Sequence, residues 1–174
     1  MNQSHDPLES ITIESPVGPL TLVASPAGLR AVLWPTDGPE RVPLGAIDAA
    51  ASSSSNSVLA AATSQLCEYF DGERQDFDVD LDPVGTDFQR DAWTALRTIP
   101  FAGTVSYGEQ ADRMGDKRKA RAVGAANGRN PISIIVPCHR VVGANGSLTG
   151  FAGGIDTKQW LLAHEQRVAG NTLL

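Results

Sequence analysis

The residues best suited to chemistry are a cysteine and a histidine that adjoin in the chain, Cys138 and His139, with Arg140 next. A thiol with basic or cationic neighbours can have a lowered pKa and a larger fraction of nucleophilic thiolate. The sequence therefore predicts that Cys138 is a nucleophile. Successive side chains of an extended segment point to opposite faces, so we expect the proton to reach His139 through a bridging water. The alternative is that Cys138 is a small buried hydrophobic residue and His139 a turn residue.

The stretch before this cysteine indicates how it is held. Ile132 to Val136 is an apolar run rich in β-branched residues, which predicts a short buried strand. Pro137 ends that strand because its ring fixes φ and its nitrogen has no hydrogen to donate. We therefore expect Cys138 at the end of a rigid element.

A family resemblance adds to this prediction. Pro-Cys-His-Arg-Val at 137–141, preceded by Arg-Asn-Pro and followed by a helix carrying Leu-Leu-Ala-His-Glu, resembles the active-site signature of the O6-alkylguanine-DNA alkyltransferases, also called methylated-DNA–protein-cysteine methyltransferases. The resemblance extends from about Asp82 to Glu165. It implies a single-turnover DNA repair protein in which Cys138 displaces the alkyl group from O6 of guanine and keeps it as a thioether. It leaves O4-alkylthymine open as a second substrate.

The resemblance also implies roles for individual residues. His139 accepts the thiol proton and Glu165 bonds the imidazole, the three-part arrangement common in nucleophilic catalysis. Asn130 braces the active-site turn. Tyr107 pushes the phosphate and donates a hydrogen bond to N3 of the guanine.

The reacting carbon belongs to a base inside a stacked duplex, so the base must be flipped into a pocket. The resemblance assigns Arg121 to fill the vacated place and puts its helix in the minor groove of double-stranded DNA. The carbonyls of Cys138 and Val141 would accept from the exocyclic amine, and the N–H of Ala152 would donate to O6. The expected pocket residues are Val141, Phe151, Ala152 and Asn127, and the expected DNA contacts are Tyr107, Lys117, Arg118, Lys119, Ala120, Arg121, Ala122 and Gly124. Phe151 stands where many members have tyrosine, so a hydroxyl is missing there.

Charge is distributed unevenly along the chain. The formal net charge is −6, yet residues 86–145 hold 9 Lys and Arg against 5 Asp and Glu, whereas residues 1–85 hold 3 against 13. A local basic module in an acidic protein is typical of a nucleic-acid footprint. A solvated basic face is the alternative.

The predicted fold class is α+β, with an N-terminal domain at 1–81 and a C-terminal domain at 82–174. Alternation and Pro/Gly turns predict a small antiparallel sheet covered by one helix. The expected strands are 11–15, 20–25, 29–34 and 77–81, the expected covering helix is 58–70, and 35–57 is expected to be a mobile loop. Trp34 is expected to be structural, and Cys67 a core thiol on the helix.

The C-terminal domain is predicted to be a mainly helical winged helix-turn-helix. Thr86 with Gln89, and Ser106 with Glu109, form capping boxes that begin two helices. A further helix, 117–127, combines a basic start with small residues that allow close approach to DNA or, alternatively, to another helix. Residues 143–146 predict a turn in a short hairpin or wing. Asp156 and Gln159 are expected to cap the last helix.

No cofactor, metal or membrane partner is expected. The N-terminal domain offers only His5 and Cys67 as metal ligands, and no apolar run approaches the roughly 20 residues that a membrane span needs. A nucleophilic thiol requires a reducing compartment, which predicts a cytoplasmic location. We expect a monomer, with cooperative DNA binding left open.

Three alternatives remain at this stage. A cysteine hydrolase would explain Cys138, His139 and Glu165 but not the basic helix. A winged helix-turn-helix regulator without chemistry would explain the helices but not Cys138. A non-catalytic relative that only binds lesions would not need a reactive cysteine.

Overall fold

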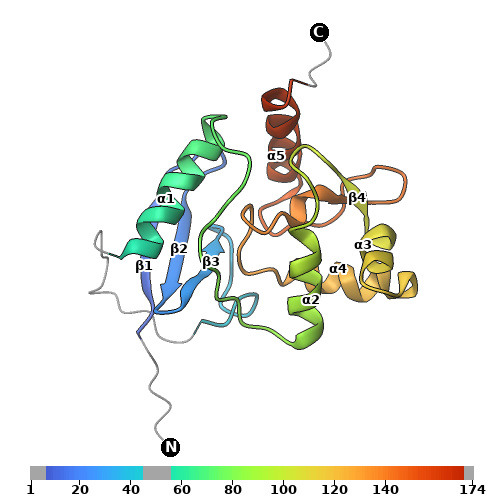
Figure 1. Cartoon of the computed structure of the whole chain (residues 1–174), viewed down its shortest axis with the longest axis horizontal. Helices are drawn as coiled ribbons and strands as arrows, with labels where there is room; N and C mark the ends of the chain where they lie inside the picture. The colour runs from blue at the N-terminus through green and yellow to red at the C-terminus, as the bar shows by residue number, and fades with distance from the viewer. Residues whose placement is uncertain (1–6, 45–55, 171–174) are drawn as a thin grey trace, which may run out of the picture.

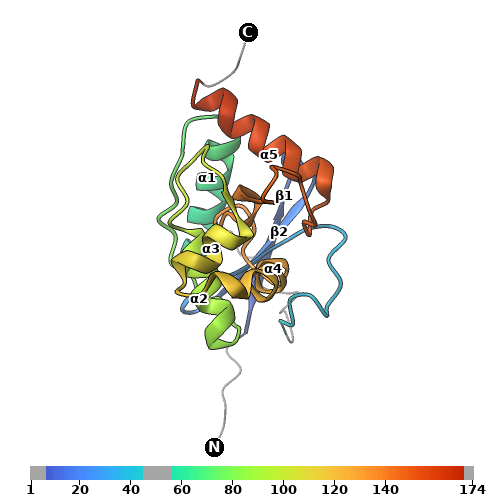
Figure 2. The same cartoon turned by 90° about the vertical axis from the view of Figure 1, so that its right-hand side faces the viewer.

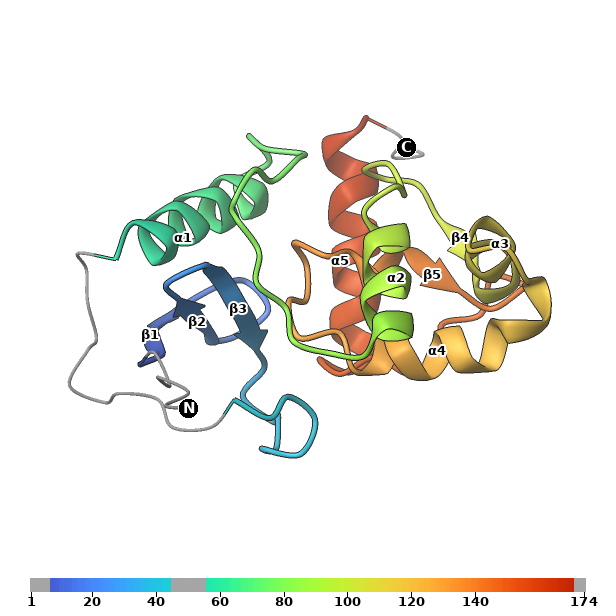
Figure 3. The ribbon, with the colours of Figure 1, turned by 60° about the horizontal axis from the view of Figure 1, so that its bottom comes forward.

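The structure is a computed structural model that describes residues 7–44 and 56–170. Figure 1 shows two halves: an N-terminal sheet with one helix, and a C-terminal group of helices around short strands. The segment that joins α1 to α2 passes between the halves (Figure 3). The predicted α+β fold class is therefore confirmed.

The N-terminal sheet has three antiparallel strands in sequence order, β1 Glu9–Ile13, β2 Leu20–Ser25 and β3 Gly28–Leu33. The helix α1, Ser57–Phe70, is capped by Asn56 and buries its apolar stripe against the sheet. These elements match the prediction, except that β1 begins and ends two residues early. The turn Ser15–Gly18, in which Gly18 has φ of 99°, includes Ser15, the last residue of the predicted strand.

Two predictions for this half are wrong. Residues 77–81 form only one bridge, Leu81 to Leu29, although Leu29 N–H donates to Asp80 at 2.8 Å. The first part of the expected mobile loop is packed, because Val42 is buried with a small cluster on the outer face of the sheet. The rest of that loop, 45–55, and His5 lie outside the described residues.

The C-terminal half is built from short elements. They are α2 Asp87–Leu96, β4 Val105–Ser106, α3 Tyr107–Arg113, the 3-10 helix η1 Lys117–Lys119, α4 Ala120–Gly128, the 3-10 helix η2 Cys138–Arg140, β5 Val141–Val142 and α5 Ile155–Val168. Both predicted capping boxes are present, on α2 and on α3. Figure 2 shows α3 and α4 together on the face turned to the viewer, with the N-terminal sheet behind them.

Several details of this half differ from the predictions. The predicted basic helix begins as a 3-10 turn, since Asp116 accepts from the N–H of Arg118 and caps that turn. The predicted turn at 143–146 is formed, but β5 pairs in parallel with β4 and no return strand follows among residues 147–154. Helix α5 is preceded by Gly154, with φ of 93°, and has no side-chain cap, so Asp156 lies inside its first turn.

Trp93 on α2 is a core residue, since it is buried and donates from its indole nitrogen to the carbonyl of Ala126 at 2.8 Å. Cys67 is on α1 but exposed, because it lies on the side of the helix away from Leu66 and Tyr69. Within the described ranges, no helix is long and apolar enough to cross a membrane.

Candidate active site and DNA-binding helix

The segment before the cysteine is a tight buried turn, so the predicted strand at 132–136 is wrong. Val136 N–H donates back to the carbonyl of Ile132 at 2.9 Å, and Ile134 has φ of 74°. A non-glycine residue at positive φ is strained and persists only where its surroundings hold it. Here burial stabilises the strained backbone conformation, since the Ile134 side chain is 0% exposed. A buried turn and a buried strand have the same apolar composition, which is why the sequence pattern failed.

Asn130 bridges the two ends of this turn. Its side-chain nitrogen donates to the carbonyl of Val136 at 2.8 Å, and its side-chain oxygen accepts from Ile132 N–H at 3.0 Å. The backbone carbonyl of Asn130 accepts from Arg41 at 2.8 Å, and Asp37 holds that guanidinium through two oxygens. A loop of the N-terminal half thus holds the active-site turn, and no local sequence pattern predicts this contact.

Cys138 follows this turn as the first residue of η2, where the backbone curls instead of extending. Burial raises the pKa of its thiol, although the Asn130 side chain and the charges of Lys158 and Arg41 act in the opposite direction. The expected lowering of this pKa by its sequence neighbours is therefore wrong for the resting protein. Arg140 turns away from the thiol and donates to the carbonyl of Ile99 at 2.8 Å.

His139 is fully buried, and its Nε2 lies 2.6 Å from Oε2 of Glu165. Burial lowers the pKa of His139, despite the opposing effect of Glu165. A carboxylate can only accept, so a neutral imidazole donates from Nε2 and keeps a lone pair on Nδ1. Nδ1 is buried and has no hydrogen-bond partner among the described protein atoms. It is therefore the atom of this site that can receive a proton.

Glu165 accepts hydrogen bonds from three residues besides His139. Its oxygens accept from Arg140 at 2.8 and 3.2 Å, from the backbone N–H of Ala102 at 3.0 Å, and from the hydroxyl of Tyr69 at 2.7 Å. Burial alone would raise the pKa of Glu165, but its hydrogen bonds with His139 and Arg140 and the charge of Arg140 hold it well below its ordinary value. Glu165 is thus a carboxylate whose charge is matched by Arg140, which leaves His139 neutral.

The loop that follows β5 forms a wall beside Tyr107. Thr149 donates its hydroxyl hydrogen to the Tyr107 hydroxyl at 2.9 Å, and the buried Lys158 donates to the carbonyl of Thr149 at 3.2 Å. The Lys158 ammonium lies 5.9 Å from the centre of the Tyr107 ring. Burial lowers the pKa of Lys158, while the neighbouring Cys138 opposes this shift. Sequence reasoning missed Lys158, because a lysine on a helix is usually exposed.

The same loop is held by Trp34 of the N-terminal half. Phe151 meets the Trp34 ring edge to face at 5.5 Å between centroids, and the indole nitrogen of Trp34 donates to Ser133 at 3.0 Å. A Cβ on Gly153 would lie 2.8 Å from the Trp34 ring, so this position has no room for a side chain. The structural role predicted for Trp34 thus includes shaping the loop that carries Phe151 and Ala152. Val141 is fully buried in β5, and its N–H donates to the carbonyl of Cys138.

The basic residues predicted to contact DNA lie on the surface of η1 and α4. Lys117, Arg118, Lys119, Arg121 and Ala122 are exposed, and Ala120 and Gly124 are half-buried. Arg118 is paired with Asp116 at 3.0 Å, and Lys119 lies 5.7 Å from the Phe88 ring centre. Gly124 faces Tyr107, since a Cβ there would lie 3.6 Å from the tyrosine ring.

Asn127, which we expected in the substrate pocket, has a different role. Its side chain exchanges two hydrogen bonds with Gln110, at 2.8 and 3.1 Å, inside the protein. Both residues are buried. Asn127 therefore connects α4 to α3 through hydrogen bonds and is not a pocket residue.

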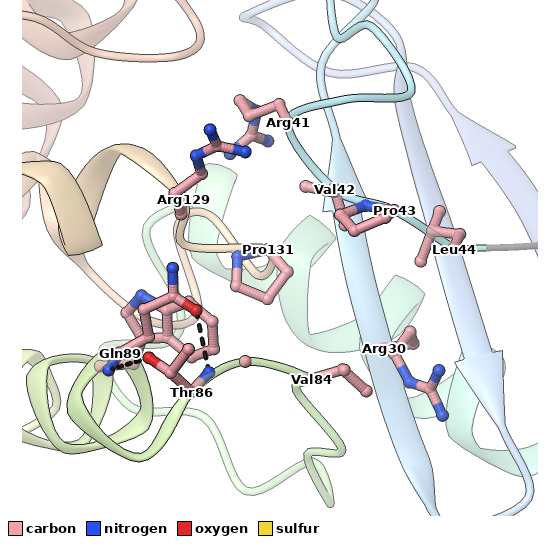
Figure 4. A pocket seen from close by; sticks show the side chains of 12 residues that line it. Arg30, Arg41, Val42, Pro43, Leu44, Val84, Thr86, Gln89, Arg129 and Pro131 are labelled. Atoms are coloured by element: carbon pink, nitrogen blue, oxygen red, sulfur yellow. Dashed lines mark hydrogen bonds between the residues drawn. The ribbon is translucent and has the colours of Figure 1, made fainter.

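A cavity of about 340 Å³ lies between the two halves, behind the active-site turn (Figure 4). It is lined by Arg41 to Leu44, by Val84 to Thr86, and by Pro131. Neither Cys138 nor His139 belongs to its lining, so this cavity is separate from the nucleophile. Arg129 reaches across beside it and donates to the carbonyl of Glu40 at 2.9 Å.

Both halves of the chain match known proteins. Residues 10–83 match the family model of the 6-O-methylguanine DNA methyltransferase ribonuclease-like domain, and residues 87–167 match that of its DNA binding domain. A methylated-DNA–protein-cysteine methyltransferase of Mycolicibacterium paratuberculosis is 47% identical over 92% of this chain and 93% of its own length. The one from Mycobacterium bovis is 50% identical over 89% and 90%.

Solved structures give the same result. A crystal structure of Mycobacterium tuberculosis O6-methylguanine methyltransferase is 48% identical, with a TM-score of 0.79 over 92% of this chain and 93% of that chain. Another, of the M. tuberculosis OGT in complex with DNA, is 45% identical, with a TM-score of 0.78 over 92% and 94%. These matches favour neither the hydrolase nor the regulator. The chain belongs to the 6-O-methylguanine DNA methyltransferase family, the methylated-DNA–protein-cysteine methyltransferases.

Proposed function

We propose that this protein repairs double-stranded DNA by moving the alkyl group of O6-alkylguanine onto Sγ of Cys138, once per molecule. The observation that carries the proposal is the buried His139, which follows Cys138 in η2 and bonds Glu165, in the same half of the molecule as the exposed basic residues of η1 and α4. The family membership of the chain supports the same reaction.

The chemical step is a direct displacement. The thiol proton passes through a water to Nδ1 of His139, and the Glu165 carboxylate stabilises the resulting imidazolium. The thiolate then attacks the alkyl carbon, so a carbon–sulfur bond forms while the carbon–O6 bond breaks and its electron pair stays on the guanine. The guanine regains a proton, and the thioether has no hydrolytic exit. One protein molecule therefore repairs one base.

Access to the base requires flipping it out of the stack, which costs a few kcal/mol. In this proposal α4 enters the minor groove, Arg121 occupies the vacated place, and Lys117, Arg118 and Lys119 neutralise phosphates. The exposure of these side chains and the small residues beside them support this docking. The protein acts as a monomer in the cytoplasm, where its thiol stays reduced.

Within the pocket, Tyr107 donates to N3 of the flipped guanine, and Ala152 N–H donates to O6. The carbonyls of Cys138 and Val141 accept from the exocyclic amine, and Phe151 forms an apolar wall. The hydrogen bond from Val141 N–H to the Cys138 carbonyl fixes the direction of that acceptor and supports this assignment.

The test is intact mass spectrometry after incubation with excess duplex that contains O6-methylguanine. We expect the mass to rise by one methyl group on the peptide that contains Cys138, and the repaired product to stop at one equivalent. Cys138→Ser should abolish transfer and leave DNA binding largely intact. Continued turnover, or transfer to another residue, would refute the proposal.

A further inference from the structure

The Glu165 carboxylate receives a hydrogen bond from the other half of the molecule. Tyr69, in the last turn of α1, is fully buried and places its hydroxyl 2.7 Å from Oε2 of Glu165. The same oxygen lies 2.6 Å from Nε2 of His139. The Arg140 guanidinium also donates to this oxygen, at 3.2 Å. Three donors thus share one oxygen, and Tyr69 is the one that comes from the N-terminal half.

We propose that Tyr69 is a positioning residue of the alkyl-transfer site, which fixes the Glu165 carboxylate and draws negative charge away from His139. This inference rests on the proposed function for its kinetic consequence, but the contact itself does not. Through Tyr69 the N-terminal half would set how strong a base His139 is.

The ring of Tyr69 is held so that its hydroxyl has a fixed direction. Aromatic side chains surround it, with ring centres between 5.2 and 6.2 Å away: Phe70, Phe77, Phe101 and His164. In addition, the backbone carbonyl of Tyr69 lies 2.8 Å from Nε2 of His164 on α5. The phenol therefore donates to Glu165 from a rigid frame that joins α1 to α5.

A hydrogen bond from the neutral Tyr69 hydroxyl to the Glu165 carboxylate changes the basicity of His139, which bonds the same carboxylate. Each hydrogen bond to Glu165 stabilises its charged form, so losing one makes the carboxylate a stronger acceptor. A stronger acceptor pulls harder on the Nε2 proton and stabilises the imidazolium form of His139. Other ionisable groups act on His139 and Glu165 as well, namely Arg140 from η2 and Lys158 from α5. A tyrosine-to-phenylalanine change leaves all of them in place.

Tyr69→Phe removes the hydroxyl and keeps the ring. The single-turnover rate falls on the acidic side of its pH profile, which we call the acid limb. We expect the midpoint of this limb to move to higher pH by about half to one pH unit, the size expected for one ordinary hydrogen bond. The direction follows because a more basic His139 is already protonated at a higher pH and cannot accept the thiol proton. Site-specific 3-fluorotyrosine at position 69 is a stronger donor of nearly the same size, so it should move the limb downward.

A second measurement does not depend on alkyl transfer. The imidazole N–H resonance of His139 should move downfield in Tyr69→Phe and upfield with 3-fluorotyrosine, since it reports the strength of the bond to Glu165. Phe77→Leu is the matched control, because Phe77 packs on the Tyr69 ring without touching Glu165. It should lower the melting temperature but leave the pH limb and the resonance unchanged.

The outcomes separate the two hypotheses. If wild-type protein transfers no alkyl group, the proposed function fails, and the resonance still decides the coupling between Tyr69 and His139. If wild-type protein transfers the group but neither Tyr69 variant moves the limb or the resonance, Tyr69 is a packing residue and this inference is overturned. Equal shifts in Phe77→Leu would overturn it as well.

Discussion

At the scale of single residues, the orientation of Arg140 decides the charge state of the site. Its guanidinium lies on Glu165 and not on Cys138, so the buried carboxylate is neutralised without a proton on His139. A neutral imidazole beside a neutral thiol is ready to accept a proton when the substrate arrives. The resting protein therefore avoids keeping a buried thiolate, which burial makes costly.

Glu165→Gln should show how much this buried pair stabilises the protein. Glutamine leaves Arg140 as a buried charge without its partner, and breaking such a pair costs about 3–5 kcal/mol. Urea unfolding should reveal this loss, and transfer from duplex DNA and from a free alkylguanine base should slow together. Glu109→Gln is the control, since Glu109 is exposed and glutamine keeps its capping box. A variant as stable as wild type would contradict the role of Glu165 as counter-charge to Arg140.

At the scale of elements, the run from η1 to α4 presents charge first and small side chains second. The 3-10 turn projects three consecutive basic residues, and α4 then offers alanine and glycine on its outer side. Small side chains let a backbone come close to a surface, and basic ones attract phosphate. This order of residues suits an element that lies along DNA.

Arg121→Ala should separate base flipping from chemistry. If Arg121 fills the place of the flipped base, it offsets part of the few kcal/mol that unstacking the base costs. Losing Arg121 would raise the barrier to repair by that part, and each 1.36 kcal/mol of barrier slows the reaction tenfold. Repair of duplex DNA should slow roughly ten- to a thousandfold, while reaction with free alkylguanine stays nearly unchanged. Single-turnover rates on both substrates test this. Arg113→Ala, an exposed charge at the end of α3, is the matched control. Equal slowing on both substrates would show that Arg121 does not fill the place of the flipped base.

The basic turn itself should govern the salt dependence of binding. Each phosphate contact contributes about −0.9 to the slope of log affinity against log salt. Replacing Lys117 and Lys119 by alanine should make that slope shallower by up to about 1.8 and weaken binding equally on alkylated and unmodified duplex. Fluorescence anisotropy over a range of salt concentrations measures both quantities. An unchanged slope would mean that Lys117 and Lys119 do not contact DNA phosphates.

At the scale of the whole molecule, the N-terminal half supports a reaction whose nucleophile it does not carry. Arg41 holds the active-site turn, Trp34 holds the pocket loop, and Tyr69 holds Glu165. This half also carries most of the acidic charge, which repels a polyanion. In the proposed function, this charge would direct an approaching duplex to the basic residues of η1 and α4.

Protein stability should fall on mild acidification because His139 is buried without charge. The unfolded chain takes up a proton at this residue near pH 6.5, whereas in the folded protein its pKa is lowered. Stability is therefore complete above pH 6.5 and is lost as the pH falls, by up to about 1.4 kcal/mol per pH unit. Urea unfolding between pH 7.5 and 5.0 tests this, and His139→Gln should lack that part of the slope. A flat wild-type profile would contradict it.

The sequence predicted those parts of the molecule that depend on local patterns. The capping boxes and the covering helix follow from residues close together in the chain. The proposed roles of Cys138 and His139 also come from such a local pattern. The turn at 132–136 could not be predicted, because its hydrogen bonds come from the Asn130 side chain and its burial from the other half. The role of Tyr69 could not be predicted for a related reason. A tyrosine on an apolar helical stripe has the same sequence pattern whether it only packs or also donates a hydrogen bond. Contacts between distant segments determined what local reasoning missed.

The contact between Trp34 and Gly153 has a consequence for the history of the family. The indole ring fills the space that a side chain at 153 would need, so neither position can change freely while the other stays as it is. In an alignment of relatives, a larger residue at 153 should be accompanied by a smaller one at 34. Such paired replacement would mean that the pocket loop and the N-terminal sheet have evolved as one unit, despite lying far apart in the gene.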